Sequence, residues 1–433
     1  MRSAITALPC LMYVALAATA WSQVHDDSPK SFPDDVRKAW RKTGAEPGWI
    51  AVDDFSLEFI SQVGERKHVE TPAFRWEFGT FDSAVLSKLP RPNQGFGIDL
   101  SDTYITDATL KELAAFNRLQ VLDIGNGFFA MWGPLKSRRS LVSDVGLKEL
   151  ARLSELRLLD VRASNITDAG LKHLADLKFL QGINVSYTAV SDAGFKGLEQ
   201  FPDLRHVDVS HTSVTDAGMR NLAGFKKLTM LNIGGNAITD AALGNVKRLK
   251  QLRGISLDET AVTNQGLVQL AEFKQLEFLS LARTQITDIG MKDIAALNRL
   301  RVLKVGRNRL TDVGLKEIGR MKSLVRLDIG NINGNDKITS AGIKAIAALK
   351  QLEYLSLYGT SIDDRGLKEL TGLDKLRSLI LGVTKVTDAG MRELVNLKQL
   401  QWLDVGETMV TDEGVKLLKQ SLPKLKVVRS ERI

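Results

Sequence analysis

The chain is almost free of cysteine. Of its 433 residues only Cys10 carries a thiol, and Cys10 lies among the first twenty residues. Once that segment is removed, the remaining chain can form no disulfide. It also has no thiolate to act as a nucleophile, to bind zinc or to carry a lipid anchor. Thiol enzymes, zinc-thiolate domains and lipoproteins are therefore excluded for the mature chain.

Catalytic motifs are also missing. The sequence contains no GxSxG, no GxxxxGK[ST], no GxGxxG before a helix and no HExxH. Five histidines are present, and His206 stands two residues before Asp208, with His211 just beyond. Residues two apart on a strand share a face, so a metal site is one interpretation, but a solvated polar patch is the favoured one. We predict a protein that is not an enzyme and that has no cofactor and no metal.

The first twenty residues have the layout of a secretory signal peptide. Arg2 provides a basic start, residues 4–18 are mostly apolar, and residues 18–20 are small enough for cleavage. The alternative is an uncleaved anchor, because the apolar run approaches the roughly 18 residues that span a bilayer. Pro9 and two threonines disfavour it. We expect residues 1–20 to be cleaved, leaving an exported periplasmic, cell-surface or extracellular protein without a membrane span.

One phrase is repeated thirteen times in the rest of the chain. In residues 153–177 it reads LSELRLLDVRASNITDAGLKHLADL. The residue in the column of the Asp in "TD" is called the marker here. Markers are spaced by 24 residues except for two steps of 37 and 28, which indicate insertions of 13 and 4 residues. The markers are Asp107, Asp144, Asp168, Asp192, Asp216, Asp240, Asn264, Asp288, Asp312, Ser340, Asp364, Asp388 and Asp412.

Each unit predicts one strand and one short helix. A segment with apolar residues two apart, such as Leu279 and Leu281, is followed by a polar turn and then by apolar residues at helical spacing. The column before the marker holds Ser or Thr in twelve units and Asp363 in the other, all good N-cap residues. Gly stands two residues after the marker in eleven units, the exceptions being Thr109 and Ala242. Because Gly in a helix is costly, we infer that neighbouring turns approach closely there.

The repeat resembles that of the leucine-rich-repeat family. The pattern LxxLxLxxTxITDxGLxxLxxL covers about residues 95–433, and its helix-bearing 24-residue unit is similar to GALA-type and ribonuclease-inhibitor-like repeats. The resemblance implies an α/β solenoid, a horseshoe with parallel strands on its concave face and helices on its convex face, and a binding role. It also implies hydrogen bonds across repeats from a Thr or Asn column. Relatives of animals and plants usually have disulfide-tied caps, so a cysteine-free mature chain points to a secreted bacterial type.

Residues 21–95 do not repeat. Ser31–Thr43 predicts a short helix, and residues 48–52 and 73–78 predict strands rich in aromatic residues. A solenoid has to cover the open apolar end of its first repeat, and these aromatics are suited to do so. We therefore predict a small α+β cap at residues 21–95 and a solenoid of about 13 repeats at residues 96–433.

Candidate binding residues lie on the predicted concave face. The positions that flank the inward leucines of the strands project there, and the C-terminal half gathers aromatic residues with arginine, a composition typical of interface hot spots. Scattered apolar residues on a large surface are the alternative. The candidate concave patch is Phe278, Arg326, Asp328, Tyr354, Tyr358, Ile380, Trp402 and Asp404.

The larger insertion carries a second candidate surface. Both insertions fall between a strand and a helix, hence on one rim of the solenoid. An aromatic-rich loop there is either a contact loop or a cover for the N-terminal region. Its candidate residues are Phe128, Phe129, Met131, Trp132, Arg138 and Arg139.

Two columns of basic residues account for the net charge of +8. The first stands four residues after the marker, as in Asp168 and Lys172, and is explained by ion pairs along each helix. The second precedes the strands and has no built-in partner in the sequence, so it is either a soluble loop face or a surface for an anionic polymer. Its members are Lys178, Lys226, Lys250, Lys274, Lys322, Lys350 and Lys398.

Three functions are compatible with these features. The leading hypothesis is an exported, non-enzymatic protein that binds a protein or peptide through its concave face and insertion rim. A cell-surface or envelope structural protein that holds an anionic polysaccharide is the alternative. A substrate receptor of a ubiquitin ligase, suggested by relatives with similar repeats, is the weakest, because residues 21–95 contain no F-box-like segment and the leader contradicts that setting. Nucleic acid is not an expected partner.

Overall fold

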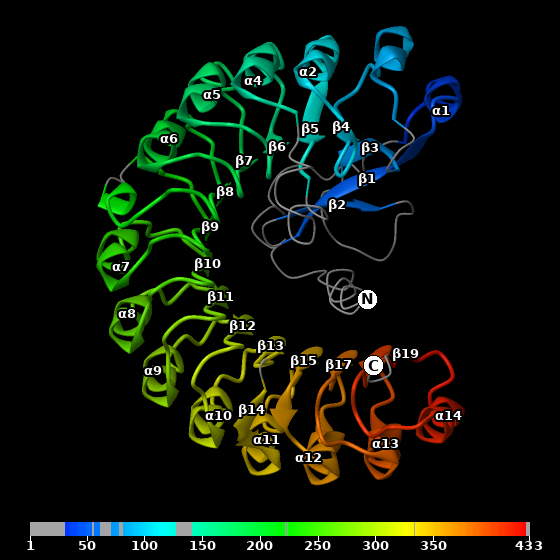
Figure 1. The fold of residues 1–433 in the computed structure, drawn as a ribbon, viewed down its shortest axis with the longest axis vertical. Helices are drawn as coiled ribbons and strands as arrows, with labels where there is room; N and C mark the ends of the chain where they lie inside the picture. The colour runs from blue at the N-terminus through cyan, green and yellow to red at the C-terminus, as the bar shows by residue number, and fades with distance from the viewer. Residues whose placement is uncertain are drawn as a thin grey trace. The chain divides into compact units, whose positions relative to one another are not determined.

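Short parallel strands, one per repeat, organise the structure. The computed structural model describes residues 31–53, 56–60, 71–77, 81–126, 141–220, 222, 224–332 and 334–429. The chain divides into two units, Met1–Ala237 with Arg248–Leu252, and Ile238–Lys247 with Arg253–Ile433, called the N-terminal and C-terminal units here. Within each unit the strands line the inner side and the helices the outer side (Figure 1).

The N-terminal unit begins with a small antiparallel sheet and continues as a parallel ladder. Strand β1 pairs antiparallel with β2 and β3, and β3 pairs in parallel with β4, the first strand of the repeats. Its strands are β1 (Ala45–Asp53), β2 (Ser56–Ile60), β3 (Thr71–Trp76), β4 (Phe96–Asp99), β5 (Leu119–Asp123), β6 (Leu158–Asp160), β7 (Gly182–Asn184), β8 (His206–Asp208) and β9 (Met230–Asn232). Its helices are α1 (Asp34–Arg41), η3 (Ser83–Lys88), α2 (Asp107–Leu113), α4 (Asp144–Leu150), α5 (Asp168–His173), α6 (Asp192–Gly197), η4 (Leu198–Gln200) and η5 (Gly218–Arg220).

The C-terminal unit repeats the same strand–helix step from β10 to β19. Its main strands pair in parallel and in register with their neighbours, while β14 and β16 pair beside the smaller insertion. Its strands are β10 (Gly254–Ser256), β11 (Phe278–Ser280), β12 (Val302–Lys304), β13 (Arg326–Asp328), β14 (Asn335–Thr339), β15 (Tyr354–Ser356), β16 (Thr360–Ser361), β17 (Ser378–Ile380), β18 (Trp402–Asp404) and β19 (Lys426–Val428). Its helices are α7 (Asp240–Val246), α8 (Asn264–Leu270), α9 (Asp288–Ile294), α10 (Asp312–Ile318), α11 (Ser340–Ile346), α12 (Asp364–Glu369), η6 (Leu370–Gly372), α13 (Asp388–Glu393), η7 (Leu394–Asn396) and α14 (Asp412–Ser421).

Aromatic side chains join the first repeat to the residues before it. Trp40 of α1 is fully buried, and its ring stacks on Phe74 of β3 with centroids 4.1 Å apart. The Trp40 ring also meets Phe96 of β4 at 6.0 Å and Phe116 of the first repeat at 5.7 Å. Its indole N–H donates to the Pro90 carbonyl at 3.0 Å, which satisfies the polar atom of a buried ring. These contacts cover the apolar end of the first repeat.

The marker residue ties each repeat to the next one. Asp144 accepts two hydrogen bonds from Thr167 of the following repeat, one from its backbone N–H at 2.8 Å and one from its hydroxyl at 2.6 Å. Thr167 is the N-cap of α5, and its hydroxyl oxygen accepts from the N–H of Ala169. The same pair of bonds recurs, for example from Thr263 to Asp240 and from Thr311 to Asp288. One carboxylate therefore orients the helix start of the neighbouring repeat.

The repeated glycine makes room for that carboxylate. A Cβ atom at Gly170 would overlap the Oδ1 atom of Asp144, and one at Gly314 would overlap the Oδ1 atom of Asp288. The close approach of neighbouring turns inferred from the glycine column is thus confirmed. Thr109 is tolerated in this column because its repeat is the first and no marker precedes it.

The sequence predicted an ion pair between a marker acid and the basic residue four positions later. This prediction is wrong for the markers that accept hydrogen bonds from the next repeat. Both carboxylate oxygens of Asp168 accept hydrogen bonds from Ser191 of the next repeat, at 2.8 and 2.6 Å. The ion pairs found among the described residues do not include one between Asp168 and Lys172. The carboxylate faces the neighbouring repeat because two short, charge-assisted bonds there outweigh one exposed ion pair.

The cross-repeat bonds implied for the Thr and Asn column come from its asparagines. Asn236 donates to the Val209 carbonyl of the preceding repeat at 2.7 Å, and its Oδ1 accepts from the N–H of Thr212. Asn308 repeats this arrangement at Leu281. The threonine hydroxyls donate to a carbonyl of their own repeat, as Thr188 does to Val185 at 2.6 Å. Those of Thr212 and Thr284 also reach the asparagine Oδ1 of the following repeat, at 3.2 and 3.1 Å.

The turn after most of the repeat strands holds a left-handed residue. There the N–H donates to the next repeat, as Val383 does to the Gly406 carbonyl at 2.8 Å, and φ is positive. Few non-glycine residues adopt this conformation, and a β-branched side chain is the least suited to it. Among the described residues, the non-glycine residues with positive φ are Asp102, Ala163, Tyr187, His211, Glu259, Arg283, Arg307, Val383 and Glu407.

Substitution of two glycines in the N-terminal unit tests the marker contact. We expect Gly170→Ala to lower the free energy of unfolding by about 2–3 kcal/mol, because the added Cβ displaces a carboxylate that holds two hydrogen bonds. Gly197→Ala is the matched control, since a Cβ there meets nothing within 4 Å. It should raise stability by about 0.5–1 kcal/mol. Urea unfolding measures both, and equal effects of the two substitutions would contradict the marker contact.

A second pair of variants tests the strain at the left-handed turn. We expect Val383→Asn to raise the free energy of unfolding by about 1 kcal/mol, because asparagine accepts positive φ more readily than valine. Val268→Asn, in the exposed middle of α8, serves as the control and should change stability little, since valine and asparagine have similar helix propensities. Thermal unfolding compares them, and a loss of stability at Val383 would refute the strain.

Candidate functional site

The inner face of the C-terminal unit is built from the first and third residues of each strand. The middle residues, such as Leu355 of β15 and Leu403 of β18, are fully buried in the core. Because side chains alternate along a strand, the flanking residues face the opposite way. Seven of the eight candidate residues are such flanking residues, from β11, β13, β15, β17 and β18. Tyr358 lies in the turn after β15.

Strand register brings these residues into one surface. Arg326 pairs with Tyr354, Tyr354 with Ser378, and Ser378 with Trp402. Neighbouring strands lie about 4.8 Å apart, so Tyr354 and Trp402 are separated by about 10 Å. In the other row, Asp328 pairs with Ser356, and Ile380 with Asp404. The patch is therefore contiguous, although it spans more than a hundred residues of sequence.

The patch is more tightly packed than a set of exposed hot-spot residues. Phe278, Arg326, Tyr354 and Ile380 have only 5–9 % of their surface exposed, whereas Trp402 and Tyr358 are half-buried. The expectation that these tyrosine and arginine side chains are openly exposed is thus wrong for Tyr354 and Arg326. The cause is the strand spacing, because large side chains in adjacent parallel strands cover one another.

Two cations lie over aromatic rings on this face. The Lys304 ammonium sits 5.1 Å from the ring centre of Phe278, and the Arg326 guanidinium sits 4.9 Å from that of Tyr354. Such contacts are worth about 0.5–2 kcal/mol and hold the side chains in one geometry. Sequence reasoning selected Phe278, Arg326 and Tyr354 but missed Lys304. The sequence did contain the signal for Lys304, because Lys304 is the third residue of β12, the strand that pairs with the strand of Phe278.

Tyr358 occupies a place that glycines leave open. Its ring lies against Gly382, where an added Cβ would approach within 2.7 Å of the tyrosine Cε2, and its Cβ lies beside Gly330. Burial raises the pKa of Tyr358, and the nearby carboxylates Glu407 and Asp404 raise it further. Glu407 is thus a neighbour of the patch that sequence reasoning missed. It holds the left-handed turn position after β18.

The inner face of the N-terminal unit carries a row of carboxylates and amides. Asp160 receives the Asn184 amide at 3.0 Å, and Asp208 receives the Asn232 amide at 2.9 Å. Arg162 lies between Asp160 and Asp123, at 3.3 and 3.6 Å. Burial raises the pKa of Asp123 well above its ordinary value, and the neighbouring Asp160 raises it further.

The same row shapes the turn after each strand. The carboxylate of Asp208 accepts from the N–H of Ser210, two residues on, at 2.8 Å, and Asp123 does the same with Gly125 at 2.9 Å. These are Asx turns, which end the strand locally. The row therefore has a structural role. The described residues contain no group of three or more His, Cys, Asp or Glu side chains placed to hold a metal ion.

The lysine column before the strands has partners of its own. Lys178 donates to the Ala175 carbonyl at 2.6 Å, and Lys398 donates to the Val395 carbonyl at 2.8 Å. Lys322 and Lys350 also donate to backbone carbonyls, at 2.6 and 2.9 Å. The expectation that this column lacks built-in partners is wrong for these four residues. Their ammonium groups satisfy carbonyls left open where each helix ends.

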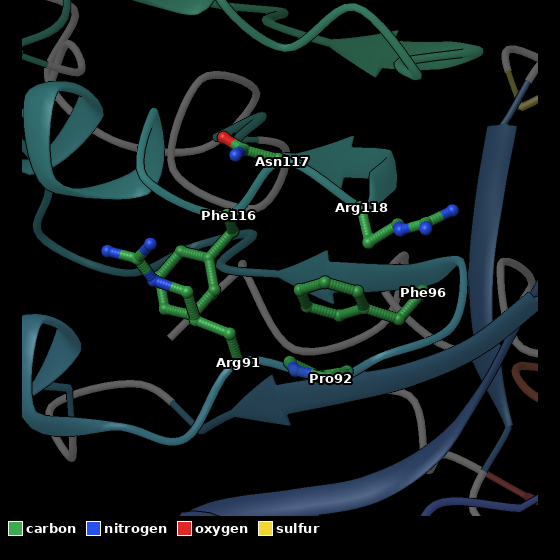
Figure 2. A pocket seen from close by; sticks show the side chains of 6 residues that line it. All are labelled: Arg91, Pro92, Phe96, Phe116, Asn117 and Arg118. Carbon is green, nitrogen blue, oxygen red and sulfur yellow. The ribbon is translucent and has the colours of Figure 1, made fainter.

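One small pocket lies where the chain enters β4 and β5. Figure 2 shows the ring of Phe96 near Pro92, with the side chain of Arg91 crossing the ring of Phe116 in this view and that of Arg118 extending to the other side. Its volume is about 210 Å³, and its lining residues are Arg91, Pro92, Phe96, Phe116, Asn117 and Arg118. Pockets for small ligands typically measure about 300–1,000 Å³, and Arg118 already pairs with Glu155 at 3.2 Å. This pocket is therefore a poor candidate for a ligand site.

The candidate residues of the larger insertion lie outside the described residues, as do residues 1–20. They are Phe128, Phe129, Met131, Trp132, Arg138 and Arg139. Among the helices that the structure describes, none combines the length and the apolar character needed to cross a bilayer.

His206 and Asp208 of β8 predict two opposite effects of pH on stability. Burial lowers the pKa of His206 to about 4, whereas burial raises the pKa of Asp208 to about 6. Between pH 4 and 6 the unfolded chain binds the His206 proton more tightly than the folded chain does, so the contribution of His206 to the free energy of unfolding rises with pH. The folded chain binds the Asp208 proton more tightly than the unfolded chain does, so the contribution of Asp208 falls with pH. The two slopes, each about 1.4 kcal/mol per pH unit, nearly cancel.

Removing either group should expose the slope of the other. We expect the stability of His206→Gln relative to the parent chain to fall between pH 4 and 6. The stability of Asp208→Asn relative to the parent should rise over the same range. Urea unfolding at several pH values measures both, and parallel curves for the two variants would refute the assignment.

Comparison with known proteins agrees with this architecture. A family model described as a leucine-rich repeat region matches residues 260–433, and a second leucine-rich-repeat model matches residues 202–223. No curated protein sequence matches significantly. An internalin from Listeria monocytogenes is similar in structure, with 20% identity, a TM-score of 0.51, and coverage of 82% of this chain and 89% of that one. A leucine-rich-repeat protein from Leptospira interrogans has 19% identity, a TM-score of 0.42, and coverage of 77% and 89%. Residues 202–223 and 260–433 therefore match leucine-rich repeats, and the repeating strand–helix step gives the chain the leucine-rich-repeat fold.

Proposed function

We propose that this chain is an exported, non-enzymatic binding protein that docks a segment of another protein on the inner face of its C-terminal unit. The leucine-rich-repeat fold is commonly used for protein–protein interaction. The observation that carries the proposal is the contiguous surface on β11 to β18, where Lys304 packs on Phe278, Arg326 packs on Tyr354, and Trp402 lies half-buried in the same row.

This surface is preorganised for binding. The cation–ring contacts and the strand register hold its side chains in place before a partner arrives. Each rotamer-rich side chain that need not be ordered on docking saves about 0.5–1.5 kcal/mol of association free energy. Buried Tyr354 and Arg326 then serve as a rigid floor, and half-buried Trp402 and Tyr358 provide the area that a partner can cover.

Export is supported by the sequence of the first twenty residues. Their basic start, apolar run and small residues match a signal peptide. The absence of cysteine beyond residue 20 suits an oxidising location, because no thiol is exposed to oxidation there.

A structural role on an anionic polymer has less support. Four lysines of the column that suggested it donate to backbone carbonyls, so their charges serve the helix ends. A polymer would compete with these bonds.

Substitution of the half-buried aromatics tests the proposed function. We expect the double variant Tyr358→Ala and Trp402→Ala to lose at least about tenfold in capture of its protein partner, because interface energy concentrates in such anchors. Affinity capture from envelope and extracellular fractions, read by mass spectrometry, measures this. Phe179→Ala removes an exposed aromatic from the N-terminal unit and is the control. Identical capture by both variants and the parent chain would exclude the surface.

A further inference from the structure

Two repeat positions carry opposite charges at β12 and at β18, called here the two ends of the binding surface. In the repeat of β12, the third strand residue is Lys304 and the left-handed turn residue is Arg307. In the repeat of β18, the same two positions hold Asp404 and Glu407. All four side chains are half-buried, so each keeps a surface that a partner can reach.

The repeats between these ends are almost uncharged at the same positions. The third strand residues are Asp328, Ser356 and Ile380, and the turn residues include Gly359 and Val383. The one exception, Asp328, accepts from the Gly330 N–H at 2.9 Å and lies close to Lys304 and Arg307. Asp258 also lies close to Lys304, but Lys304, Arg307 and Arg326 together still outnumber the two carboxylates.

The negative end combines carboxylates with aromatic rings. Glu407 and Asp404 are close enough to raise the pKa of Tyr358, and Glu407 also raises that of Asp404, after the larger effect of burial. Trp402 lies two residues before Asp404 on the same face of β18. Carboxylates next to the faces of Tyr and Trp form the surroundings that favour a lysine or arginine side chain.

The distance between the two ends sets the length of a matching partner. From β12 the ladder runs through β13, β15 and β17 to β18, which is four strand steps. At ~4.8 Å per step this is about 19 Å, and an extended chain advances ~3.3 Å per residue. Two charges about six residues apart in an extended segment would therefore reach both ends at once.

We propose that the inner face of the C-terminal unit binds an extended segment of another protein with one acidic and one basic residue about six positions apart. The acidic residue meets Lys304 and Arg307, and the basic residue meets Asp404, Glu407 and the ring of Tyr358. Uncharged residues between them cover Ser356 and Ile380. Because the two ends differ in charge, the segment binds in one direction only. This inference rests on the proposed function and adds the chemistry and direction of the partner.

The chain itself supplies substitutions that reverse this polarity. Glu259 and Glu407 occupy the left-handed turn position in other repeats, and so do Arg283 and Arg307. The exchanges Arg307→Glu and Glu407→Arg therefore place residues that this position already accepts. Glu413→Arg, on the exposed start of α14, makes the same change of charge on the helix side and is the control.

Selection from a displayed library of random twelve-residue peptides against the full chain tests the inference. We expect enriched peptides to carry an acidic and a basic residue five to seven positions apart in one constant order. These peptides should bind Glu407→Arg about tenfold more weakly and Glu413→Arg unchanged. Selection against the double variant Arg307→Glu and Glu407→Arg should enrich the opposite order. If the double variant fails to fold, the single variant Glu407→Arg still tests the inference, because peptides selected against it should no longer carry the basic residue at a constant position.

The inference is overturned if the enriched peptides show no constant spacing or order, or if the double variant selects the same order as the parent. Peptides without charge order whose binding is lost in Trp402→Ala would overturn it while leaving the proposed function in place. A library that yields no peptide dependent on Trp402 or on Glu407 would count against both.

Discussion

The contact between a marker residue and the next N-cap is the interaction on which each unit depends. A carboxylate accepts a backbone N–H and a hydroxyl from the following repeat, and a glycine two residues after the next marker leaves space for it. In the C-terminal unit Asn264 replaces one marker acid and donates its amide to the Thr287 hydroxyl at 2.8 Å. Two further departures from the pattern are partners of one another. Ser340 replaces the marker acid and Asp363 replaces the N-cap hydroxyl, so the Ser340 hydroxyl donates to Asp363 at 2.6 Å. The hydrogen bond persists with its donor and acceptor exchanged, which indicates that the contact itself is required.

This contact keeps the strands in register, and register creates the binding face. Each strand contributes its first and third residues to the inner face, and the turn after it contributes one more residue. These positions recur at the strand spacing of about 4.8 Å. Each side chain therefore lies beside the side chains at the same position in the neighbouring repeats. Where these are aromatic and cationic, they stack, as Arg326 does on Tyr354. Where they are carboxylates and amides, they bond to one another and to the turns, as Asn184 does with Asp160.

Several features of this face could be predicted because they depend only on the period of the sequence. Alternation along the strand placed Tyr354 and Trp402 on one face, and the 24-residue spacing placed them two strands apart. Other features depend on where a side chain finds its best partner. Asp168 was expected to pair with Lys172 along its helix, but two hydrogen bonds from Ser191 hold it against the next repeat. Lys178 was expected to lack a partner and instead caps the end of its helix. Burial of Tyr354 and the approach of Glu407 to Tyr358 likewise follow from contacts between strands.

The amino-acid sequence alone predicts the fold class, the strand and helix of each repeat, and the face on which each residue lies. These follow from local periodicity, which thirteen copies of one phrase repeat without ambiguity. Contacts between neighbouring repeats in the folded chain decide which polar side chains form internal hydrogen bonds and which remain open at the surface. Competing partners at similar sequence distances differ in free energy by about 1 kcal/mol, so the choice is made by the geometry of neighbouring repeats rather than by residue type.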